Sequence, residues 1–385
     1  MILASIPRCT LSDDVLDYYT ESEAFEGQVP FLTKSMAPAA PEEPHVIMYT
    51  SGTTGQPKGA VLSHRKTFFN CLNADIFFKL NCDDIMLIVL PLFHSGGLFI
   101  QASPIIFKGA TMIIHRKFDP SRTYQAIRKH SVTKFLGVPT IYKALNRVAS
   151  EKTKPGASLK VCAIGGEKST PEVMAQLSKA GFPLRQIMGQ TETSILLWGG
   201  EKTILNKPGS VGKPVFHAEV KIFDDEDRPC EPGEIGEIVV RGSIMMTEYW
   251  QDPVKTEETV RGGWLHTGDL AYMTADGYFY LVDRAKDMYI SGGENVYPAE
   301  AERVLKNHPA IEDIAIVGGP DKTWGETGHA FVMLKPEAGS IDAEAIIAFC
   351  DGRLARYKWP KKVTFVQYLP RTALGKIRKV ELKNK

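Results

Sequence analysis

Residues Tyr49–Gly59 read Tyr-Thr-Ser-Gly-Thr-Thr-Gly-Gln-Pro-Lys-Gly and directly follow the apolar run Val46-Ile47-Met48. The string combines hydroxyl side chains, glycines and one lysine, Lys58. Glycines let a backbone turn several N–H groups toward one point, while hydroxyl groups add donors and an ammonium adds positive charge. The string therefore predicts a nucleotide-phosphate loop after a strand. It is not a Walker loop, because Lys58 is followed by Gly59 and not by Ser or Thr.

A cluster of Ser, Thr and Gly after a strand is usually an ordinary turn, so the rest of the chain must decide between the two readings. Further motifs follow in order: Met188–Glu192, Gly263–Leu270, Asp283–Asp287, Ser291–Asn295 and Pro370–Lys376. With these motifs the chain resembles the adenylate-forming superfamily, which contains acyl- and aryl-CoA synthetases, firefly luciferases and the adenylation domains of peptide synthetases. It is most similar to the acyl- and aryl-CoA ligases.

The composition excludes several other classes. The chain has 385 residues, enough for two or three domains, and carries 46 basic and 45 acidic residues. This balance removes the electrostatic case for nucleic acid as a main partner. Apolar stretches such as Ile85–Phe93 are too short to span a bilayer, and the first residues do not form a signal peptide. The six cysteines have no close-spaced pairs, which predicts reduced thiols and a cytoplasmic location.

The pattern of apolar residues predicts an α/β protein. Short apolar runs alternate with amphipathic stretches from 46 to about 215, with helices expected at 120–130, 139–150 and 170–180. Strand-like runs between Asp, Gly and Pro turns predict a β-rich subdomain at about 210–283. A compact α+β unit follows Arg284; its expected elements are a helix from Pro298 to about Asn307, strands Ile311–Val317 and Ala330–Lys335, a helix at 341–354 and a strand near 363–368.

The resemblance implies a large N-terminal domain of layered α/β structure, residues 1–284, and a small mobile C-terminal domain, residues 285–385. Only 48 residues precede the phosphate loop, fewer than in other members of the superfamily. We interpret the chain as a truncated form, a short reading frame or a minimal variant.

The expected reaction begins with attack of a carboxylate on the α-phosphate of ATP, so positive charge and oriented donors must gather there. The resemblance implies that Lys376 carries this step, that Thr191 meets the α-phosphate, and that Glu192 holds Mg²⁺. Asp269 and Arg284 would hold the ribose. The other nucleotide-binding residues implied are Thr50, Ser51, Gly52, Thr53, Thr54, Gly55 and Lys58 at the phosphates, and Gly165, Gly166, Glu167, Met188 and Gly189 around the adenine.

A second half-reaction is implied by the same resemblance. Lys286 lies at a hinge about which the small domain rotates, and Gly292 and Gly293 then line a channel for the pantetheine arm of CoA, where a thiol arm passes close to the backbone. His94 would lie beside the acyl group. The apolar residues expected to border that group are Phe93, Ile187, Ile195, Leu196, Leu197 and Trp198.

We therefore predict an ATP-dependent acid–thiol ligase that makes an acyl-AMP and transfers the acyl group to CoA. The expected substrates are ATP with Mg²⁺, CoA and an aryl, alicyclic or fatty acid; an amino acid is disfavoured because no Asp lies in 91–97. A homo-oligomer is compatible with these features. The alternatives are transfer to a carrier protein, formation of the adenylate alone, a luciferase-like oxygenase, and a catalytically impaired nucleotide-binding fragment.

Overall fold

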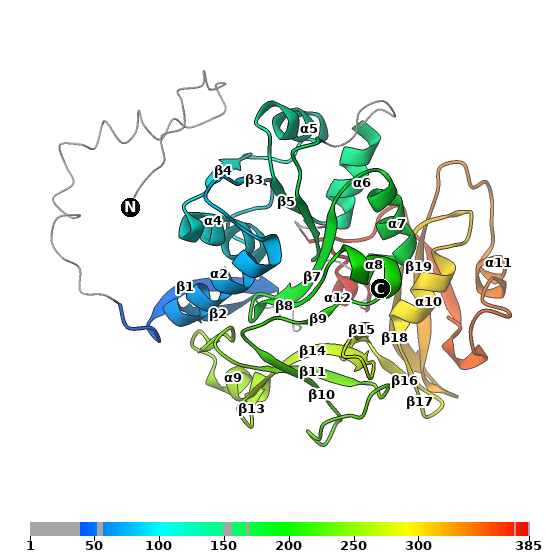
Figure 1. The fold of residues 1–385 in the computed structure, drawn as a ribbon. Coiled ribbons are helices and arrows are strands. Elements are labelled where there is room, and N and C mark those ends of the chain that lie inside the picture. Colours follow the sequence, from blue (N-terminus) through cyan, green and yellow to red (C-terminus); the bar gives the residue numbers. More distant parts are fainter. Residues whose placement is uncertain (1–38, 52–56, 149–155, 167–168, 373–374, 384–385) are drawn as a thin grey trace.

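The computed structural model describes residues 39–51, 57–148, 156–166, 169–372 and 375–383 (Figure 1). The centre of the large domain is a seven-stranded sheet in the order β4-β3-β5-β6-β7-β8-β9. Strands β3 to β7 run parallel, and β8 and β9 are antiparallel additions. The strands are β3 (Ile85–Ile88), β4 (Thr111–Ile114), β5 (Lys134–Gly137), β6 (Val161–Ile164), β7 (Leu184–Gln190), β8 (Ser194–Gly199) and β9 (Lys213–Pro214).

Helices flank this sheet, and the sequence marks where most of them begin. Asp119 caps α5 (Pro120–Lys129) and Thr170 caps α7 (Pro171–Lys179), each followed by proline at the first helical position. Ser63 caps α2 (His64–Phe78), the longest helix in the described part of the chain. The remaining helices of this region are α3 (Ser95–Gly97), the π-helix η2 (Leu98–Ala102), α4 (Ser103–Lys108), α6 (Pro139–Val148) and α8 (Glu201–Asn206).

Two smaller sheets complete the large domain. Strands β1 (Pro44–Ser51), β2 (Pro57–Ser63) and β12 (Glu248–Tyr249) form one of them, so the predicted phosphate loop joins a β-hairpin. The other sheet has the path β10-β11-β14-β13, with β15 paired to β14. Its strands are β10 (Glu219–Phe223), β11 (Gly236–Arg241), β13 (Val260–Arg261), β14 (Trp264–Met273) and β15 (Phe279–Arg284); the helix α9 (Pro253–Thr259) precedes β13.

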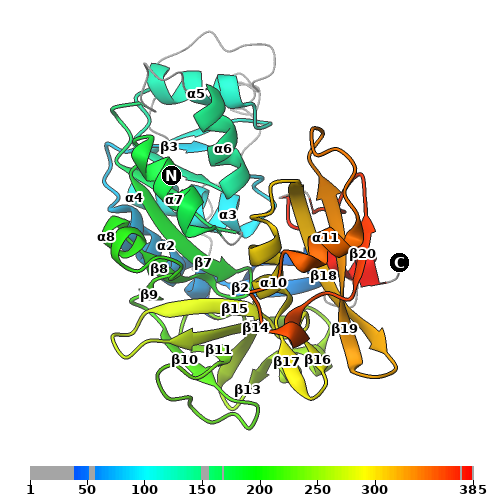
Figure 2. The ribbon, with the colours of Figure 1, turned by 90° about the vertical axis from the view of Figure 1, so that its right-hand side faces the viewer.

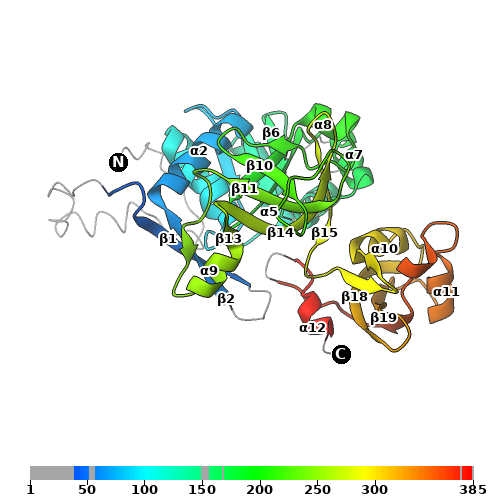
Figure 3. The ribbon, with the colours of Figure 1, turned by 90° about the horizontal axis from the view of Figure 1, so that it is seen from below.

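The C-terminal part forms a separate body beside the β-rich sheet (Figures 2 and 3). Its sheet has the path β17-β16-β19-β18, with β20 paired to β19. The elements are β16 (Tyr289–Ser291), β17 (Glu294–Val296), α10 (Pro298–Leu305), β18 (Ile311–Asp321), β19 (Gly325–Leu334), α11 (Ala343–Ala348), η3 (Arg356–Lys358), β20 (Lys362–Phe365) and α12 (Lys379–Lys383).

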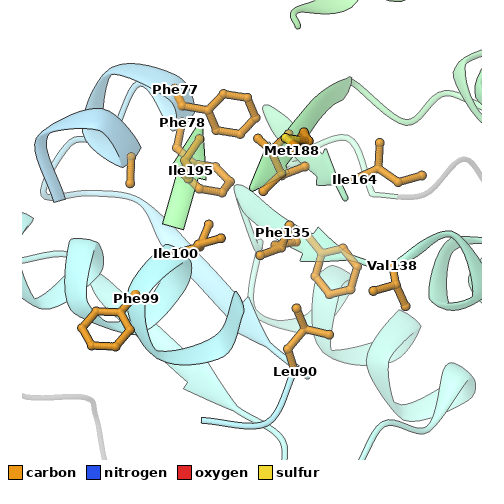
Figure 4. Close-up of a cluster of buried hydrophobic side chains, with 14 of the residues drawn as sticks. Phe77, Phe78, Leu90, Phe99, Ile100, Phe135, Val138, Ile164, Met188 and Ile195 are labelled. Carbon is orange, nitrogen blue, oxygen red and sulfur yellow. The ribbon is translucent and has the colours of Figure 1, made fainter. Parts of the chain in front are cut away.

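The buried apolar side chains divide in the same way. One continuous cluster runs from Met48 to Phe279 and includes Phe78, Phe135 and Ile164 (Figure 4). Two other clusters lie on the two faces of the C-terminal sheet, around Ile314 and around Phe331. Independent cores are the physical signature of domains, so they support a boundary after Arg284, which stays a prediction.

The elements expected from the sequence are mostly present, with corrected bounds. The strand expected at Ile311–Val317 extends to Asp321. The helix expected at 341–354 ends at Ala348, because the chain turns through Gly352, which has a φ of +67°. The strand expected at 330–335 begins earlier, at Gly325, where it pairs with Asp321 in a long hairpin. The helix α2 and the β16–β17 hairpin were not predicted. In the described residues, no helix is both long enough and apolar enough to cross a bilayer.

Candidate active site

The phosphate loop is framed by the β1–β2 hairpin. Thr50 pairs with Lys58 across the hairpin, and the Lys58 ammonium lies 5.3 Å from the centre of the Tyr249 ring. Burial and the nearby Lys255 lower the pKa of Lys58. The hairpin therefore places the Lys58 ammonium beside the Tyr249 ring. The predicted residues Gly52, Thr53, Thr54 and Gly55, and the side chain of Ser51, lie outside the described residues.

Thr191 and Glu192 form the turn between β7 and β8, and both are buried. Tyr249, on β12, donates its hydroxyl hydrogen bond to Glu192 Oε1 at 2.8 Å. Burial and this carboxylate raise the pKa of Tyr249 well above its usual range. The Glu192 carbonyl accepts from Met246 N at 2.7 Å. Tyr249 thus holds the Glu192 carboxylate, and Met246 holds the backbone of the same residue.

A single buried carboxylate fits a magnesium ion that also binds nucleotide phosphates. Mg²⁺ prefers oxygen ligands and usually takes one or two carboxylates together with phosphates and water. Among the described residues, no group of three or more His, Cys, Asp or Glu side chains could hold a metal by itself. Glu192 would therefore hold the ion jointly with the nucleotide, where the ion would neutralise phosphate charge.

Close backbone packing fixes the shape of this turn. A Cβ atom added to Gly189 would lie 1.7 Å from the Ser194 carbonyl oxygen, so this position accepts only glycine. Ser194 itself has a φ of +58°, a left-handed conformation that costs a non-glycine residue about 1 kcal/mol or more. Gln190 Nε2 donates to the Thr267 carbonyl at 3.3 Å and links the turn to β14. The turn is held in a defined and partly strained shape.

The predicted ribose pair is formed across β14 and β15. Asp269 pairs with Arg284 in the strand register, and Arg284 Nε lies 2.6 Å from Asp269 Oδ1. Burial raises the pKa of Asp269, although the positive charges of Arg284 and Lys376 act in the opposite direction. The adjacent Gly268 N–H donates to Glu237 Oε1 at 2.7 Å, which fixes the backbone. A buried carboxylate beside a guanidinium is well suited to bind a vicinal diol.

Lys376 comes from the other domain and reaches the same region. It lies in a tight turn in which Thr372 N–H donates to the Lys376 carbonyl at 2.8 Å and Lys376 N–H donates to Thr372 Oγ1 at 3.2 Å. Although the residue as a whole keeps solvent access, crowding of protein around its ammonium lowers its pKa, as does the charge of Arg284; Asp269 acts in the opposite direction. Lys376 therefore lies within electrostatic range of the ribose pair.

The turn that carries Lys376 is anchored on both sides. Lys379, on α12, forms an ion pair of 2.7 Å with Glu302 on α10. Arg371 contacts Asp313 at the start of β18. These contacts fix the C-terminal segment to α10 and β18, so the position of Lys376 is tied to those elements.

The predicted hinge residue contacts this segment, and the predicted CoA channel residues lie in the β16–β17 hairpin. The Lys286 carbonyl accepts a hydrogen bond from Lys383 Nζ at 3.4 Å, and burial lowers the pKa of Lys286. Gly292 and Gly293 turn the β16–β17 hairpin with φ values of +61° and +87°. A Cβ atom on Gly292 would approach the Trp324 ring to 2.6 Å, whereas Gly293 faces open space. The backbone is thus accessible at Gly293.

The residues predicted around adenine and the acyl group differ in their surroundings. Gly165 abuts β7, since an added Cβ would meet the Ile187 carbonyl at 2.6 Å, and Gly166 has a φ of +81°. His94 caps α3 by accepting from Gly96 N at 3.2 Å, and burial lowers its pKa. Glu167 lies outside the described residues.

Several apolar positions were expected at ligands and are instead packed in the core. Met188 is only 9% exposed and belongs to the large cluster (Figure 4), and its contact with adenine stays a prediction. Ile195, Leu196 and Leu197 are also buried, and Trp198 stacks on Phe77 at 5.7 Å. The reason is geometric, because β8 is an inner strand of the sheet with helices beside it. Phe93, in contrast, is 74% exposed.

Two residues of the site had no signal in the sequence. Tyr249 belongs to a strand of two residues, and nothing in its spacing relates it to Glu192. Ser194 follows the predicted Thr-Glu pair, but its left-handed backbone conformation depends on the approach of Gly189. The roles of Tyr249 and Ser194 in the site therefore arise from tertiary contacts.

Comparison with known proteins agrees with this geometry. The model of the AMP-binding enzyme family matches residues 4–250, and that of the AMP-binding enzyme C-terminal domain matches residues 300–376. A feruloyl-CoA synthase from Amycolatopsis sp is 41% identical over 342 residues, which are 88% of this chain and 69% of the relative. An indoleacetate–CoA ligase from Aromatoleum aromaticum is 39% identical, over 89% of this chain and 67% of the relative.

Solved structures give the same result. The o-succinylbenzoate CoA synthetase of Bacillus subtilis in complex with its acyl-adenylate intermediate has a TM-score of 0.83 and 36% identity, over 90% of this chain and 70% of that one. The same enzyme with ATP and a magnesium ion has a TM-score of 0.82 and 35% identity, over 90% and 70% of the two chains. The chain belongs to the AMP-binding enzyme family. Within it, the chain is an AMP-forming acyl- or aryl-CoA synthetase, whose substrates are ATP, CoA and a carboxylic acid and whose metal is magnesium.

Proposed function

We propose that the acid activated by this enzyme is an aromatic carboxylic acid. The relatives are named for ferulate, indoleacetate and 2-succinylbenzoate, each of which carries an aromatic ring. The surroundings of His94 are compatible with a ring. Leu90 lies against Gly96, the residue that His94 caps, and burial favours the neutral imidazole. A neutral, apolar wall favours an uncharged ring over a second charged group.

We further propose the division of roles among the residues. Lys376 bridges the incoming carboxylate and the α-phosphate, Thr191 donates to the α-phosphate, and Glu192 holds the metal with the phosphates. Asp269 and Arg284 hold the ribose, and Lys58 stabilises the leaving pyrophosphate. The observation that carries the proposal is the position of Lys376, because a lysine of the small domain lies within charge range of Asp269 and Arg284 in the large one. Two anions must approach each other in the first step, and a shared ammonium lowers their repulsion.

Rotation of the small domain would carry out the second step. The turn with Lys376 is fixed to its own domain through Glu302 and Asp313, so rotation about Lys286 removes the ammonium from the nucleotide. Gly292 and Gly293 belong to the same domain and would then face the acyl-adenylate.

The experiment is a comparison of the two half-reactions. Pyrophosphate release is measured over a panel of aromatic, alicyclic and fatty acids, with CoA or a phosphopantetheine-bearing carrier protein as acceptor. Wild type is expected to prefer an aromatic acid and CoA. In Lys376→Ala, release should fall by about 100-fold or more, while conversion of a supplied acyl-adenylate to the thioester is retained. Equal loss of both half-reactions would overturn the role of Lys376, and preference for a fatty acid would overturn the proposed aromatic substrate.

A cytoplasmic location is also proposed. The cysteines of the described residues are unpaired, and Cys71, Cys162 and Cys350 are buried as thiols. Burial raises the pKa of Cys71 and Cys162 to about 12, which keeps these thiols unreactive. Fractionation of cells that produce the protein would test this location.

A further inference from the structure

Lys66 is a buried lysine that none of the roles above uses. It is 1% exposed, and it lies on α2, next to the turn between β7 and β8. Its ammonium donates to Ser194 Oγ at 2.6 Å and lies 5.6 Å from the centre of the Phe99 ring. An ammonium has three donors, and a buried one without full pairing is expensive. A lysine in such a place needs an explanation.

The position is unfavourable for a positive charge in a second way. Lys66 is the third residue of α2, whose N-cap Ser63 accepts from Lys66 N at 3.2 Å. The first turn of a helix carries partial positive charge from its free N–H groups and disfavours a cation. The first turn of α2 contains no acidic residue that could offset this. Burial accordingly lowers the pKa of Lys66 to about 7, while the Glu192 carboxylate acts in the opposite direction.

The side chain of Lys66 contacts the 191–194 turn of the candidate active site. Its partner Ser194 has the left-handed backbone conformation described above, two residues after Glu192. The Glu192 carboxylate interacts electrostatically with the Lys66 ammonium and accepts the hydrogen bond from Tyr249. On β1, the His45 ring lies against the other neighbour of Lys66, Phe99, at 6.4 Å. Lys66 therefore links α2 to the strained 191–194 turn, and its ammonium lies next to that turn.

We propose that Lys66 is a positioning residue of the nucleotide site, which holds the 191–194 turn through Ser194 and, in its protonated form, adds buried positive charge that favours the anionic nucleotide. This inference extends the proposed function. It assigns to α2 a part in nucleotide binding, at a cost in the stability of the fold. Such a residue should improve ligand binding and lower the stability of the free protein, whereas a residue that only supports the fold should raise that stability.

The experiment uses the full chain and measures binding, so it does not depend on turnover. Lys66→Met keeps the length of the side chain and removes the charge. We expect its dissociation constant for Mg·ATP, measured by calorimetry, to rise about tenfold, the size of one moderately screened charge interaction. We expect its melting temperature without ligand to rise, because the buried charge is gone.

Two further variants complete the test. Ser194→Ala keeps the charge and removes the acceptor, and should weaken Mg·ATP binding without raising the melting temperature. Lys108→Met removes a lysine whose ion pair with Asp75, at 2.9 Å, is partly exposed, and should leave both quantities unchanged. The inference is overturned if Lys66→Met melts lower than wild type, fails to fold, or binds Mg·ATP as tightly. Failure of the proposed function would instead appear as absent turnover of aromatic acids with these binding differences intact.

Discussion

The hydrogen bond from Tyr249 to Glu192 gives the sharpest prediction about the site. Tyr249→Phe removes one oxygen atom and keeps the ring that faces Lys58. Both partners are buried, with 7% of Tyr249 and 8% of Glu192 exposed, and the bond is 2.8 Å long. Water is therefore poorly placed to replace the lost donor, and the carboxylate oxygen stays inside the protein.

The magnitude follows from this geometry. A hydrogen bond to a charged, buried acceptor contributes about 1.5–3 kcal/mol. We expect the free energy of unfolding of Tyr249→Phe to fall by an amount in that range. We also expect the KM for ATP in pyrophosphate release to rise by about tenfold or more, since every 1.4 kcal/mol is one factor of ten. The second effect arises because Glu192 is no longer held in the orientation that would meet the metal.

The assay compares denaturant unfolding and steady-state pyrophosphate release for Tyr249→Phe with a matched control. Tyr272→Phe is suitable, because the Tyr272 ring is stacked on Tyr280 at 5.0 Å and keeps that contact without its hydroxyl. The control should stay within about 0.5 kcal/mol of wild type. If Tyr249→Phe matched wild type in both stability and KM, the argument that this bond positions the carboxylate would be refuted.

Three further changes test other parts of the site. Gly189→Ala should destabilise by several kcal/mol, roughly the cost of severe overpacking, and lower the melting temperature, whereas Gly319→Ala, where an added Cβ meets nothing within 4 Å, should not. The adenylation rate should fall as the pH rises through the lowered pKa of Lys376, since only the ammonium is active. In Lys376→Arg the decrease at alkaline pH should disappear, because a guanidinium stays charged. Identical pH–rate profiles for wild type and Lys376→Arg would argue against a role of the ammonium. Asp269→Asn should weaken AMP binding by about tenfold, measured by calorimetry, and unchanged binding would exclude a ribose contact.

Much of the domain structure could be predicted from local patterns. The helices α5 and α7 begin where an Asp or Thr cap precedes proline, and the strands β5 and β6 are short apolar runs. These signals lie within a few residues of each other, so no knowledge of the fold is needed. The helix α2 was missed because its buried face includes Lys66, Asn70 and Asn73, which breaks the expected apolar pattern.

The site residues were predicted by motif, whereas their environments were not. Asp269 and Arg284 are fifteen positions apart, yet the β14–β15 pairing places them in contact. Met188 shows the opposite case. A position in a motif suggested a contact with adenine, while the strand orientation directed the side chain into the core. A motif reports which residues are present, and the direction of each side chain depends on the sheet around it.

By itself, the sequence determined the order of the motifs, the α/β character, and the residue types that adenylation chemistry requires. These depend on neighbours in the chain, through turn chemistry, capping and apolar periodicity. Only the tertiary structure decided that Tyr249 holds Glu192, that Lys66 donates to Ser194 of the same turn, and that Lys376 lies within electrostatic range of Asp269 and Arg284. The two hydrogen bonds join residues 57 and 128 positions apart, and burial sets their strength, so they appear only once the chain has folded.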